Sequence, residues 1–431
     1  MNDGGVTGDR INVAFPAHPA ALRDGGVTFL TNAFHASGAL GGQNRVARIT
    51  LCEEVPGGST GRKLVLDVEY EEPQPGLPTE LFVKFSRDFD DPIRDRGRTQ
   101  MGSEVRFAAL TDAPGFPISV PRVQFADYHR DSGTGVLISE RIRFGVNGIE
   151  PQYHKCLDYE MPDPLEHYRA LVTAVARLAG THRSGRLPAG LIEQFPVDLR
   201  GATVGEPQPL TPGRLHRKLT RLAEFAAAHP GLLPANVRSP QFLRRLGDEV
   251  HDVIRHEDAI WRRLAEGRDY IALCHWNANV DNAWFWRADD NDLRCGLMDW
   301  GCVSQMNIAI AIWGAMSGAE TDMWDRHLDE PLELVCTEVQ LSGGPKLDAE
   351  TLAAQVMLYA ALMGATWLLD LPAMLRARIS DLGPTTSRTD PRIKDDEGVR
   401  APLQMFVNFL NLWESRDFGN VLAELPCGGR P

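Results

Sequence analysis

The sequence predicts an α+β protein with a small β-rich part up to about residue 141 and a larger, mostly helical part after it. Short runs in which apolar and polar residues alternate, the pattern of half-buried strands, recur before residue 141. From about residue 144, apolar residues instead recur at the spacing of one helix face. The chain has 431 residues, 43% hydrophobic and 24% charged, so it is long enough for two domains with ordinary globular cores.

Charge and cysteine content restrict the partners and the compartment. The formal net charge is −13, and such a surface repels nucleic acid and anionic membranes, so we expect neither as a partner. The seven cysteines form no C-x-x-C pair, which favours a reducing, cytoplasmic setting over a secreted disulfide framework. The first 30 residues show no signal-peptide pattern. The longest apolar run, Val356–Leu369, is too short for a membrane span and predicts a buried helix.

The chain begins with a segment of loose composition and continues with a glycine-containing stretch. Residues 1–25 are rich in Gly, Asp and Pro and predict a flexible N-terminal arm. After Gly38, Gly41 and Gly42, the stretch VARITL alternates like a strand. The glycines predict a turn between two strands, where backbone N–H groups can approach phosphate oxygens closely. An ordinary hairpin turn without a ligand explains the same pattern.

The following strands and helix carry a lysine and a glutamate. LFVKFS alternates as a strand with Lys84 at its centre, although a lone lysine on a strand is most often simply solvated. About twenty residues later, GRTQMGSEVRFAALTD predicts a helix in which Glu104 lies off the apolar face. Glu104 can therefore point toward a partner, and Glu80 and Asp88 are further acidic residues close to Lys84 in sequence.

The last strand of the β-rich part, GVLISE, ends at Glu140, and amphipathic helices follow. HYRALVTAVARLAGTHRSG has a helical apolar stripe, and we expect His182 to cap its C-terminus, where a partly positive ring is favoured. Further helices are predicted at roughly 326–341, 348–371 and 400–417. The polar stretch GPTTSRTDPRIKDDEG between the last two predicts a mobile loop.

The densest polar pattern of the chain lies in LCHWNANVDNAWFWRADDNDLRCGLMDWG, where strand-like runs alternate with polar turns. His275, Asn277 and Asn282 precede the predicted hairpin, and Asp299 follows it. Amide and carboxylate oxygens are the ligands that hard cations prefer. Asn282 and Asp299 therefore predict a Mg2+ site.

This motif resembles the catalytic centre of the kinase-like phosphotransferases, the family that includes aminoglycoside phosphotransferases and choline or ethanolamine kinases. His275-Trp276-Asn277 stands where the family has His-Gly-Asp, Asn282 stands at its Asn, and Asp299 precedes Trp300 as in its Asp-Trp pair. The resemblance covers roughly residues 25 to 320.

The resemblance implies a protein-kinase-like two-lobe fold. The N-lobe, residues 26–141, would bind the nucleotide with a β-sheet and one helix. The C-lobe, residues 142–431, would hold the catalytic hairpin and a helical region that binds the acceptor. The implied co-substrate is ATP or GTP, and the implied acceptor is a small molecule whose identity the sequence does not give. A monomer or a homodimer is expected.

The resemblance also assigns a role to each matched residue of the N-lobe. Lys84 would hold the α- and β-phosphates, and Glu104 would orient that lysine. Gly41 and Gly42 would lie in the glycine-rich loop that covers the nucleotide. Glu140 would lie in the hinge, where the backbone meets the base.

In the matched C-lobe motif, Asn282 and Asp299 would hold Mg2+, and His275 would hydrogen-bond the catalytic loop. Asn277 would position the acceptor hydroxyl. Because Asn277 replaces the catalytic aspartate of the family, the site lacks a carboxylate that accepts the hydroxyl proton. Asn307 stands near the place of a second family aspartate that supports the active-site loops.

These departures leave two functions open. The first is an ATP-dependent phosphotransferase that acts on a hydroxyl of a small molecule, slowed by Asn277 but still helped by positioning and metal electrostatics. Asp281 could substitute for the missing carboxylate, although strand register favours another direction for its side chain. The second is a pseudokinase that binds a nucleotide or another ligand as a regulatory protein.

Overall fold

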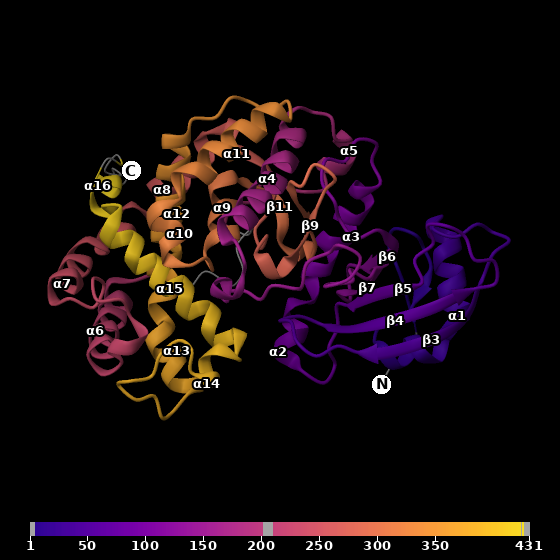
Figure 1. Cartoon of the computed structure of the whole chain (residues 1–431), viewed down its shortest axis with the longest axis horizontal. Helices are drawn as coiled ribbons and strands as arrows, with labels where there is room; N and C mark the ends of the chain where they lie inside the picture. The colour runs from indigo at the N-terminus through magenta and orange to yellow at the C-terminus, as the bar shows by residue number, and fades with distance from the viewer. Residues whose placement is uncertain (1–4, 201–209, 424, 426–431) are drawn as a thin grey trace. The chain divides into compact units, whose positions relative to one another are not determined.

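The computed structural model describes residues 5–200, 210–423 and 425, and it divides the chain into two compact units (Figure 1). The first unit holds a five-stranded sheet and the second is mostly helical. The predicted α+β class, with a smaller β-rich N-terminal part and a larger helical C-terminal part, is therefore confirmed. The first unit comprises Met1–Glu150, Leu187–Phe195 and Gly296–Val303; the second comprises Pro151–Arg186, Pro196–Cys295 and Ser304–Pro431.

An antiparallel sheet with the strand order β3-β4-β5-β7-β6 forms the centre of the first unit. Apolar residues alternate along its strands, as the sequence predicts, because successive side chains of a strand point to opposite faces. The strands are β3 (Val46–Glu54), β4 (Arg62–Tyr70), β5 (Glu80–Phe85), β6 (Val123–His129) and β7 (Thr134–Glu140).

Helices cover both faces of this sheet. Phe125 on β6 packs edge-on against Phe29 of α1 (Pro19–Ser37), with 5.9 Å between the ring centroids. The next residue, Ala126, points to the opposite face and belongs to the cluster formed with Val105 of α3 (Gln100–Thr111). Burying each large apolar side chain in these layers contributes about 1.5–3 kcal/mol. The second layer fixes α3 over β6 and β7, from where Glu104 reaches Lys84 on β5.

The described part of the segment predicted as an N-terminal arm contains regular structure. β1 (Val6–Thr7) pairs with β2 (Ala14–Phe15), and α1 begins at Pro19, so a boundary after residue 25 falls inside that helix. The carboxylate of Asp127 on β6 accepts the backbone N–H groups of Arg10 at 3.0 Å and Ile11 at 2.8 Å. These bonds tie the segment to the edge of the sheet. Residues 1–4 of the predicted arm lie outside the described residues.

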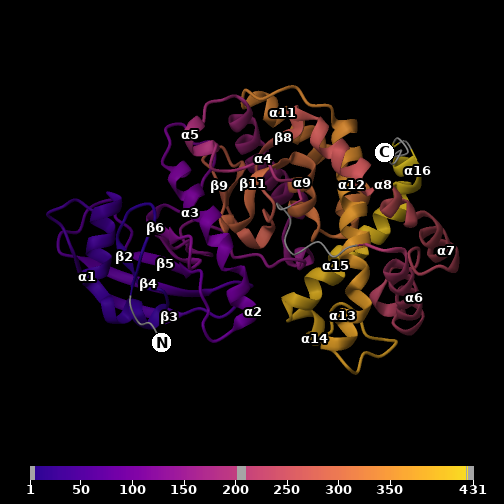
Figure 2. The ribbon, with the colours of Figure 1, turned by 180° about the vertical axis from the view of Figure 1, so that it is seen from behind.

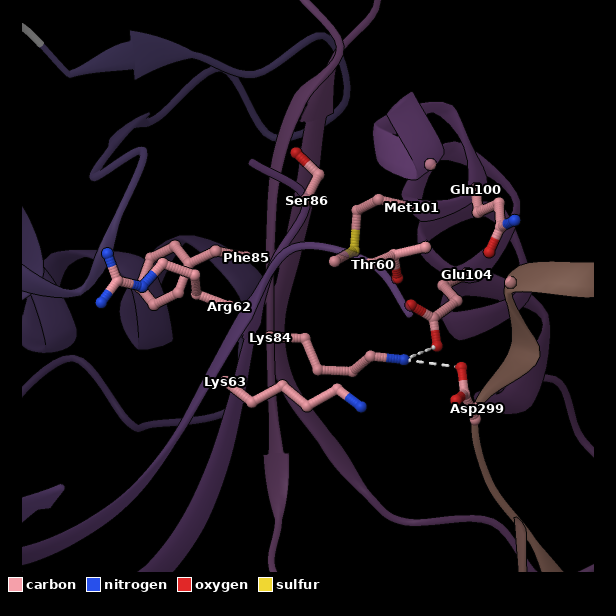
Figure 3. Close-up of a pocket in the computed structure, with 12 residues that line it drawn as sticks. Thr60, Arg62, Lys63, Lys84, Phe85, Ser86, Gln100, Met101, Glu104 and Asp299 are labelled. Atoms are coloured by element: carbon pink, nitrogen blue, oxygen red, sulfur yellow. Dashed lines mark hydrogen bonds and ion pairs between the residues drawn. The ribbon is translucent and has the colours of Figure 1, made fainter. Parts of the chain in front are cut away.

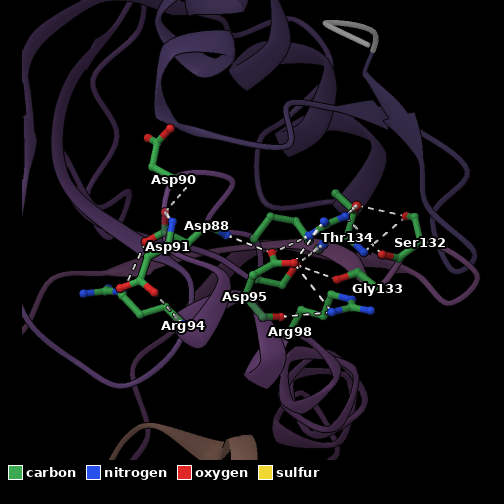
Figure 4. A network of polar contacts seen from close by, with 12 residues as sticks. Asp88, Asp90, Asp91, Arg94, Asp95, Arg98, Ser132, Gly133 and Thr134 are labelled. Carbon is green, nitrogen blue, oxygen red and sulfur yellow. Dashed lines mark hydrogen bonds and ion pairs between the residues drawn. The ribbon is translucent and has the colours of Figure 1, made fainter. Parts of the chain in front are cut away.

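A polar network holds the segment between β5 and α3 (Figure 4). Asp95, the last residue of α2 (Pro92–Asp95), accepts two hydrogen bonds from Arg87, at 2.7 and 3.1 Å. The same carboxylate accepts the backbone N–H of Asp88 at 3.1 Å. Arg94 pairs with Asp88 at 3.2 Å and donates to the carbonyl of Gly61. The network therefore links α2 to the segment after β5 and to the turn between β3 and β4.

The second unit consists of helices and two small strand pairings, β9 with β10 and β11 with β8. Its strands are β8 (Ile271–His275), β9 (Ala283–Arg287), β10 (Leu293–Leu297) and β11 (Val303–Asn307), of which the ends of β10 and β11 belong to the first unit. Its longer helices are α4 (Pro164–Arg183), α6 (Pro212–Ala228), α7 (Pro240–Glu249), α8 (His251–Glu266), α9 (Ile308–Met316), α11 (Asp329–Leu341), α12 (Ala349–Thr366), α13 (Leu371–Arg378) and α15 (Glu397–Ser415). The short ones are α10 (Thr321–Arg326), α14 (Pro391–Lys394) and α16 (Phe418–Ala423), and α5 (Ala189–Ile192) belongs to the first unit.

Helix α12 forms the centre of the second unit. It lies beside α8, α9 and α15 in Figures 1 and 2, and nearly every residue from Val356 to Ala365 is buried. The stretch Ala349–Arg378 is long and apolar enough to cross a membrane by length and composition, but 78% of its most apolar window is buried inside the structure. The prediction of a buried helix at this place is confirmed.

Two expectations for the helical part need correction. The polar stretch predicted as a mobile loop contains α14 and leads directly into α15, which begins at Glu397. His182 lies in the last turn of α4, but its Nδ1 accepts the backbone N–H of Leu273 on β8 at 3.1 Å. Burial, together with the charge of Arg183, lowers the pKa of His182 to about 4. The ring is therefore neutral at pH 7 and anchors a strand instead of carrying a positive charge at the helix end.

Candidate active site

Three charged side chains meet in the first unit, and all three are residues that the sequence analysis assigns to the site. The Lys84 Nζ lies 2.5 Å from Glu104 Oε1 and 2.8 Å from Asp299 Oδ1 (Figure 3). Lys84 lies on β5, Glu104 on α3, and Asp299 directly after β10. One ammonium group therefore bridges two carboxylates that are far apart in the sequence.

Local structure explains why these side chains converge. On β5, Leu81, Val83 and Phe85 are buried in the cluster under α1, so Lys84 points to the opposite face, where α3 lies. Glu104 is 6% exposed and lies one helical turn from Met101, which packs on that face of the sheet. Glu104 therefore lies on the same side of α3 as Met101 and Ala108, and not off the apolar face as the sequence predicted.

The charges of the three groups depend on one another. Burial lowers the pKa of Lys84, but the charges of Asp299 and Glu104 outweigh burial, so its pKa lies above the ordinary value. Burial raises the pKa of Glu104, and the charge of Asp299 raises it further, against the opposing effect of Lys84. Lys84 is therefore a permanent cation at neutral pH, and Glu104 is the group whose charge depends most on that cation.

Lys63 is a fourth charged residue of this pocket, and the sequence analysis missed it. Lys63 on β4 is the direct cross-strand partner of Lys84, and Figure 3 shows both side chains extending from neighbouring strands toward Asp299. Burial, and then the charge of Lys84, lower the pKa of Lys63. The alternation of KLVLDVEY offered a signal, because Leu64 and Leu66 face the core and leave Lys63 on the face of Lys84.

The side chains around Lys84 nearly fill the space between β4, β5 and α3. The remaining cavity is about 10 Å³, room for about one water molecule. Its described lining includes Thr60 from the turn between β3 and β4, Gln100 from α3 and Gly301 after β10. Two ammonium groups and two carboxylates thus share a small polar space at the surface of the sheet.

The glycines that approach this pocket are not the ones the sequence analysis expects. Gly41 and Gly42 lie in the connection between α1 and β3, not in a turn between two strands, and neither is among the described residues that line the pocket. The expected turn fails because the residues before Gly38 form α1, and Gly38 ends that helix with a positive φ of 77°.

The turn between β3 and β4 holds a second glycine cluster, missed by the sequence analysis. Gly57, Gly58 and Gly61 all have positive φ angles, of 101°, 79° and 52°. A Cβ on Gly61 would lie 1.8 Å from the carbonyl oxygen of Phe85, and a Cβ on Gly58 would lie 2.3 Å from Lys63 Nζ. Only glycine lets this turn approach β5 and the lysine so closely.

Glu140, assigned to the hinge, ends β7 in the first unit. Its backbone N–H donates to the carbonyl of Arg122 at 2.9 Å, and its Oε1 accepts the N–H of Arg122 at 2.8 Å. These contacts hold the end of β7 against β6.

In the second unit, the loop after β8 is held by its own side chains. The N–H of Asn277 donates to His275 Nδ1 at 3.1 Å, and Asn282 Nδ2 donates to the carbonyl of Asn277 at 2.9 Å. His275 is buried and bonds the loop, which is the structural role that the resemblance implies. The side-chain oxygen of Asn277 accepts hydrogen bonds from Asn279 Nδ2 at 2.6 Å and from Lys155 Nζ at 3.2 Å.

Lys155 is a further residue that the sequence analysis missed. Its Nζ lies 3.2 Å from Asn277 Oδ1 and 3.7 Å from Asp281 Oδ2, so it joins both residues in one polar cluster. No local pattern could have found it, because Lys155 and Asn277 are 122 residues apart. Asp281 therefore does belong to the surroundings of Asn277, contrary to the expectation from strand register.

Asn307 supports the same part of the second unit as an amide. Its Nδ2 donates to the carbonyl of Leu264 at 2.8 Å and to Gln355 Oε1 at 3.0 Å, and its Oδ1 accepts the N–H of Ala309 at 2.8 Å. Asn307 is fully buried and caps the N-terminus of α9. A neutral amide makes all three bonds, and a carboxylate could not donate two of them.

The predicted metal ligands fit Mg2+ by chemistry. Asp299 offers carboxylate oxygens, and Asn282 uses its amide nitrogen toward Asn277, which directs its amide oxygen away from that bond. Asp299 belongs to the first unit and Asn282 to the second. Across the described residues, no group of three or more His, Cys, Asp or Glu side chains is arranged to hold a metal ion.

Comparisons with known proteins find similarity among solved structures. No protein-family model matches the chain. No curated protein matches its sequence. Among solved structures, it is similar to a microcompartment-associated aminopropanol kinase, with a TM-score of 0.43 and 14% identity over 87% of this chain and 95% of that one.

Two other similar structures bear names from the same group. A choline/ethanolamine kinase family protein from Mesorhizobium loti matches with a TM-score of 0.38 and 16% identity, over 83% of this chain and 92% of that one. The GDP complex of wild-type aminoglycoside 2'-phosphotransferase-IIIa matches with a TM-score of 0.37 and 14% identity, over 84% and 94% of the two chains.

Proposed function

We propose that the protein is an ATP-dependent phosphotransferase that moves a phosphoryl group to a hydroxyl of a small molecule. The observation that carries the proposal is the ammonium of Lys84, held between Glu104 at 2.5 Å and Asp299 at 2.8 Å. A buried lysine on a strand, paired with a helix glutamate, is the arrangement that orients nucleotide phosphates in kinases. GTP is the alternative nucleotide.

The first unit supplies the nucleotide-binding groups of this proposal. Lys84 holds the α- and β-phosphates, and Glu104 keeps its side chain in place. Gly57, Gly58 and Gly61 form the turn that covers the phosphates, because their backbone can approach an anion without obstruction by a side chain. This assignment replaces Gly41 and Gly42. Glu140 remains the proposed hinge residue, with its backbone as the contact to the base.

Asp299 and Asn282 are the proposed Mg2+ ligands. When bound, Mg2+ neutralises charge that develops on the transferred phosphoryl group. Lys84 Nζ, at 2.8 Å from Asp299 Oδ1, places a positive charge beside that carboxylate and fixes its direction. Asn277, through its carbonyl, fixes the amide of Asn282.

Transfer proceeds in line on this proposal: the acceptor oxygen forms a bond to the γ-phosphorus as the bond to the nucleoside diphosphate breaks. Position 277 offers no carboxylate to accept the proton of the acceptor hydroxyl. Asn277 positions the hydroxyl, and the proton leaves to solvent or to the transferred phosphoryl oxygens. Because phosphoryl transfer depends mainly on positioning and electrostatics, this arrangement slows the reaction without abolishing it.

One observation favours a second candidate, a pseudokinase that binds nucleotide or another ligand. Asn277 Oδ1 already accepts hydrogen bonds from Asn279 and Lys155, so the amide oxygen is committed to the loop itself. An amide held in this way stabilises the loop without taking part in proton transfer. Such a protein would act through binding alone.

Turnover of the Asn277→Asp variant separates the two candidates. If the site is a weakened kinase, ATP turnover rises by about a hundredfold or more, the usual contribution of a general base. If it is a pseudokinase, turnover stays at the rate of buffer. Asn291→Asp is the matched control, because it adds the same charge in an exposed turn of the same hairpin. ATP binding is measured in parallel, so that loss of folding is not mistaken for loss of chemistry.

The proposed setting is the cytoplasm, with a monomer or a homodimer as the functional form. Cys52, Cys156, Cys274, Cys295, Cys302 and Cys336, the cysteines in the described part of the chain, are all free thiols. Free thiols agree with a reducing compartment. Separation by size with light scattering would distinguish the monomer from the homodimer.

A further inference from the structure

A cavity of about 360 Å³ lies inside the second unit. Residues of α15, the loop before α14, the connection from α6 to α7 and the segment after residue 155 surround it. One wall is apolar and includes Leu232, Leu233 and Leu403. Its size is within the range of small-molecule sites, and an apolar wall of this kind fits a hydrocarbon body.

Other residues of the lining carry charge. Arg388 pairs with Glu320 at 2.8 Å, and its guanidinium lies 5.0 Å from the ring centroid of Tyr159. Arg388 also donates to Gln404 Oε1 at 3.1 Å. Arg388 and Glu320 neutralise each other, so this pair fixes the geometry of the lining without giving it a net charge.

Arg400 gives the lining a net positive charge. Its Nε donates to the carbonyl of Lys155 and its Nη1 to the carbonyl of Lys394, each at 2.9 Å. Within the described residues, no carboxylate forms an ion pair with Arg400. A half-buried guanidinium that bonds only to carbonyls keeps its full charge beside the cavity. This local charge is opposite in sign to the formal net charge of the chain, −13.

Asp158 is a buried acid next to two lining residues, and it cancels that charge at most in part. Asp158 lies behind the lining between Leu157 and Tyr159, is fully buried, and accepts a hydrogen bond from Tyr168 at 2.7 Å. Burial raises the pKa of Asp158 to about 7, so its carboxyl is partly protonated at neutral pH. The charged groups that line the cavity are thus Glu320, Arg388 and Arg400, with a sum of one positive charge.

The cavity is connected to Asn277 by two contacts. Cys156 lines the cavity, and its neighbour Lys155 bonds Asn277 Oδ1 at 3.2 Å. Arg400 in turn holds the carbonyl of Lys155. Arg400 therefore connects a ligand in the cavity to Lys155, and the side chain of Lys155 bonds Asn277, the amide proposed to position the acceptor.

We infer that this cavity binds the acceptor, and that the acceptor is a small molecule with an apolar body and an anionic group, a carboxylate or a phosphate, which Arg400 recognises. That the ligand is the acceptor rests on the proposed function, but that the cavity binds such a ligand does not. Cationic amino alcohols are excluded as good ligands, because Arg400 would repel them. The overall acidity of the chain, which suggests a cationic or neutral acceptor, is a poor guide to this one cavity.

Saturation-transfer NMR of the full chain without nucleotide tests the inference. The probes are 6-hydroxyhexanoate and 6-amino-1-hexanol, which share the hydroxyl and the carbon chain and differ in the charge at the other end. The hydroxy acid is expected to bind the wild type, and the amino alcohol to give no signal. Arg400→Gln is expected to weaken binding of the hydroxy acid about tenfold or more, the usual loss for a hydrogen bond to a charged group.

Three controls keep the result decisive. Arg400→Lys retains the charge and should recover part of the binding, whereas Arg326→Gln, at a surface ion pair, should leave it unchanged. Leu403→Trp fills the cavity and should abolish binding while thermal unfolding stays cooperative. Absence of binding by the hydroxy acid, equal binding of both probes, or full binding by Arg400→Gln would overturn the inference. ATP calorimetry on the same samples scores the proposed function separately, since neither probe requires nucleotide.

Discussion

Removing the ammonium of Lys84 is expected to destabilise the first unit through a single buried carboxylate. Lys84→Met keeps the length of the side chain and removes its charge. It leaves Glu104, 6% exposed, beside Asp299 without the cation that lies 2.5 Å from its Oε1. The side chain of Asp299 is 39% exposed and can be hydrated, so the cost falls mainly on Glu104.

The expected size follows from this difference in burial. Breaking a buried ion pair by removing one partner costs about 3–5 kcal/mol, and the hydration of Asp299 favours the lower end, about 3 kcal/mol. For a unit of this size, such a loss lowers the thermal midpoint by about 6–12 °C. Lys84→Met combined with Glu104→Gln should recover most of the loss, because no uncompensated buried charge remains.

The pH dependence of the stability of Lys84→Met tests this electrostatic explanation. In Lys84→Met the folded pKa of Glu104 lies above its unfolded value, since burial and Asp299 both raise it and the opposing cation is gone. The carboxyl is therefore neutral in the fold at low pH, and stability is lost as pH rises through the raised pKa. Scanning calorimetry at pH 5 and pH 8 should show a smaller deficit at pH 5. A deficit that is equal at both pH values, or no recovery in the double variant, would refute the electrostatic account.

Three further predictions concern single groups. Asp158→Asn keeps an acceptor for Tyr168 and should raise the unfolding free energy by up to about 4 kcal/mol at pH 8 but hardly at pH 4. The reason is the folded pKa of Asp158, about 7, because the stability that the protonated carboxyl provides to the wild type is lost as pH rises through 7. Urea titrations that show equal gains at both pH values would contradict this. The neutral ring of His182, whose folded pKa is about 4, should contribute a loss of about 3 kcal/mol as pH falls from 6.5 to 4. The unfolding free energy of the wild type should therefore fall by about 3 kcal/mol relative to that of His182→Asn over this pH range in the same titrations. Gly61→Ala should lower the unfolding free energy by more than about 3 kcal/mol, because the new Cβ collides with the carbonyl of Phe85. Gly57→Ala, with open space around its Cβ, should lower it by about 1 kcal/mol. Similar thermal midpoints for the two variants would contradict the described turn.

The sequence predicted the site best where one repeat of apolar residues sets both the secondary structure and the direction of each side chain. The alternation of β5 places Lys84 opposite the core residues, and the helical phase of α3 turns Glu104 toward it. Ordered spacing then brings Asp299 to the same lysine. Lys84 and Glu104 could be predicted because a strand and a helix set the direction of their side chains. Asp299 follows β10 with a positive φ of 64° and was assigned from the resemblance of its motif.

The misses have different physical causes. Gly41 and Gly57 belong to glycine clusters that look alike locally, and only the helix before Gly38 and the pairing of β3 with β4 decide which cluster forms the strand turn. Lys155 could not be found, because its contact with Asn277 is set by tertiary packing across 122 residues. His182 lies at a helix end, as expected, but its ring nitrogen accepts the N–H of Leu273 on β8. Helix propensity describes only local sequence and cannot show this contact.

The central claim is that Lys84, with Glu104 and Asp299, forms a nucleotide phosphate site, and calorimetric titration with ATP, with and without Mg2+, tests it most directly. The account predicts that the wild type binds ATP, more tightly with Mg2+, and that Lys84→Met weakens binding at least about tenfold, the loss of one charge-assisted hydrogen bond. Lys218→Met is the matched control, because that buried lysine pairs with Asp370 in the helical unit and should leave ATP binding unchanged. Absence of ATP binding by the folded wild type, or equal affinity in Lys84→Met, would contradict the account.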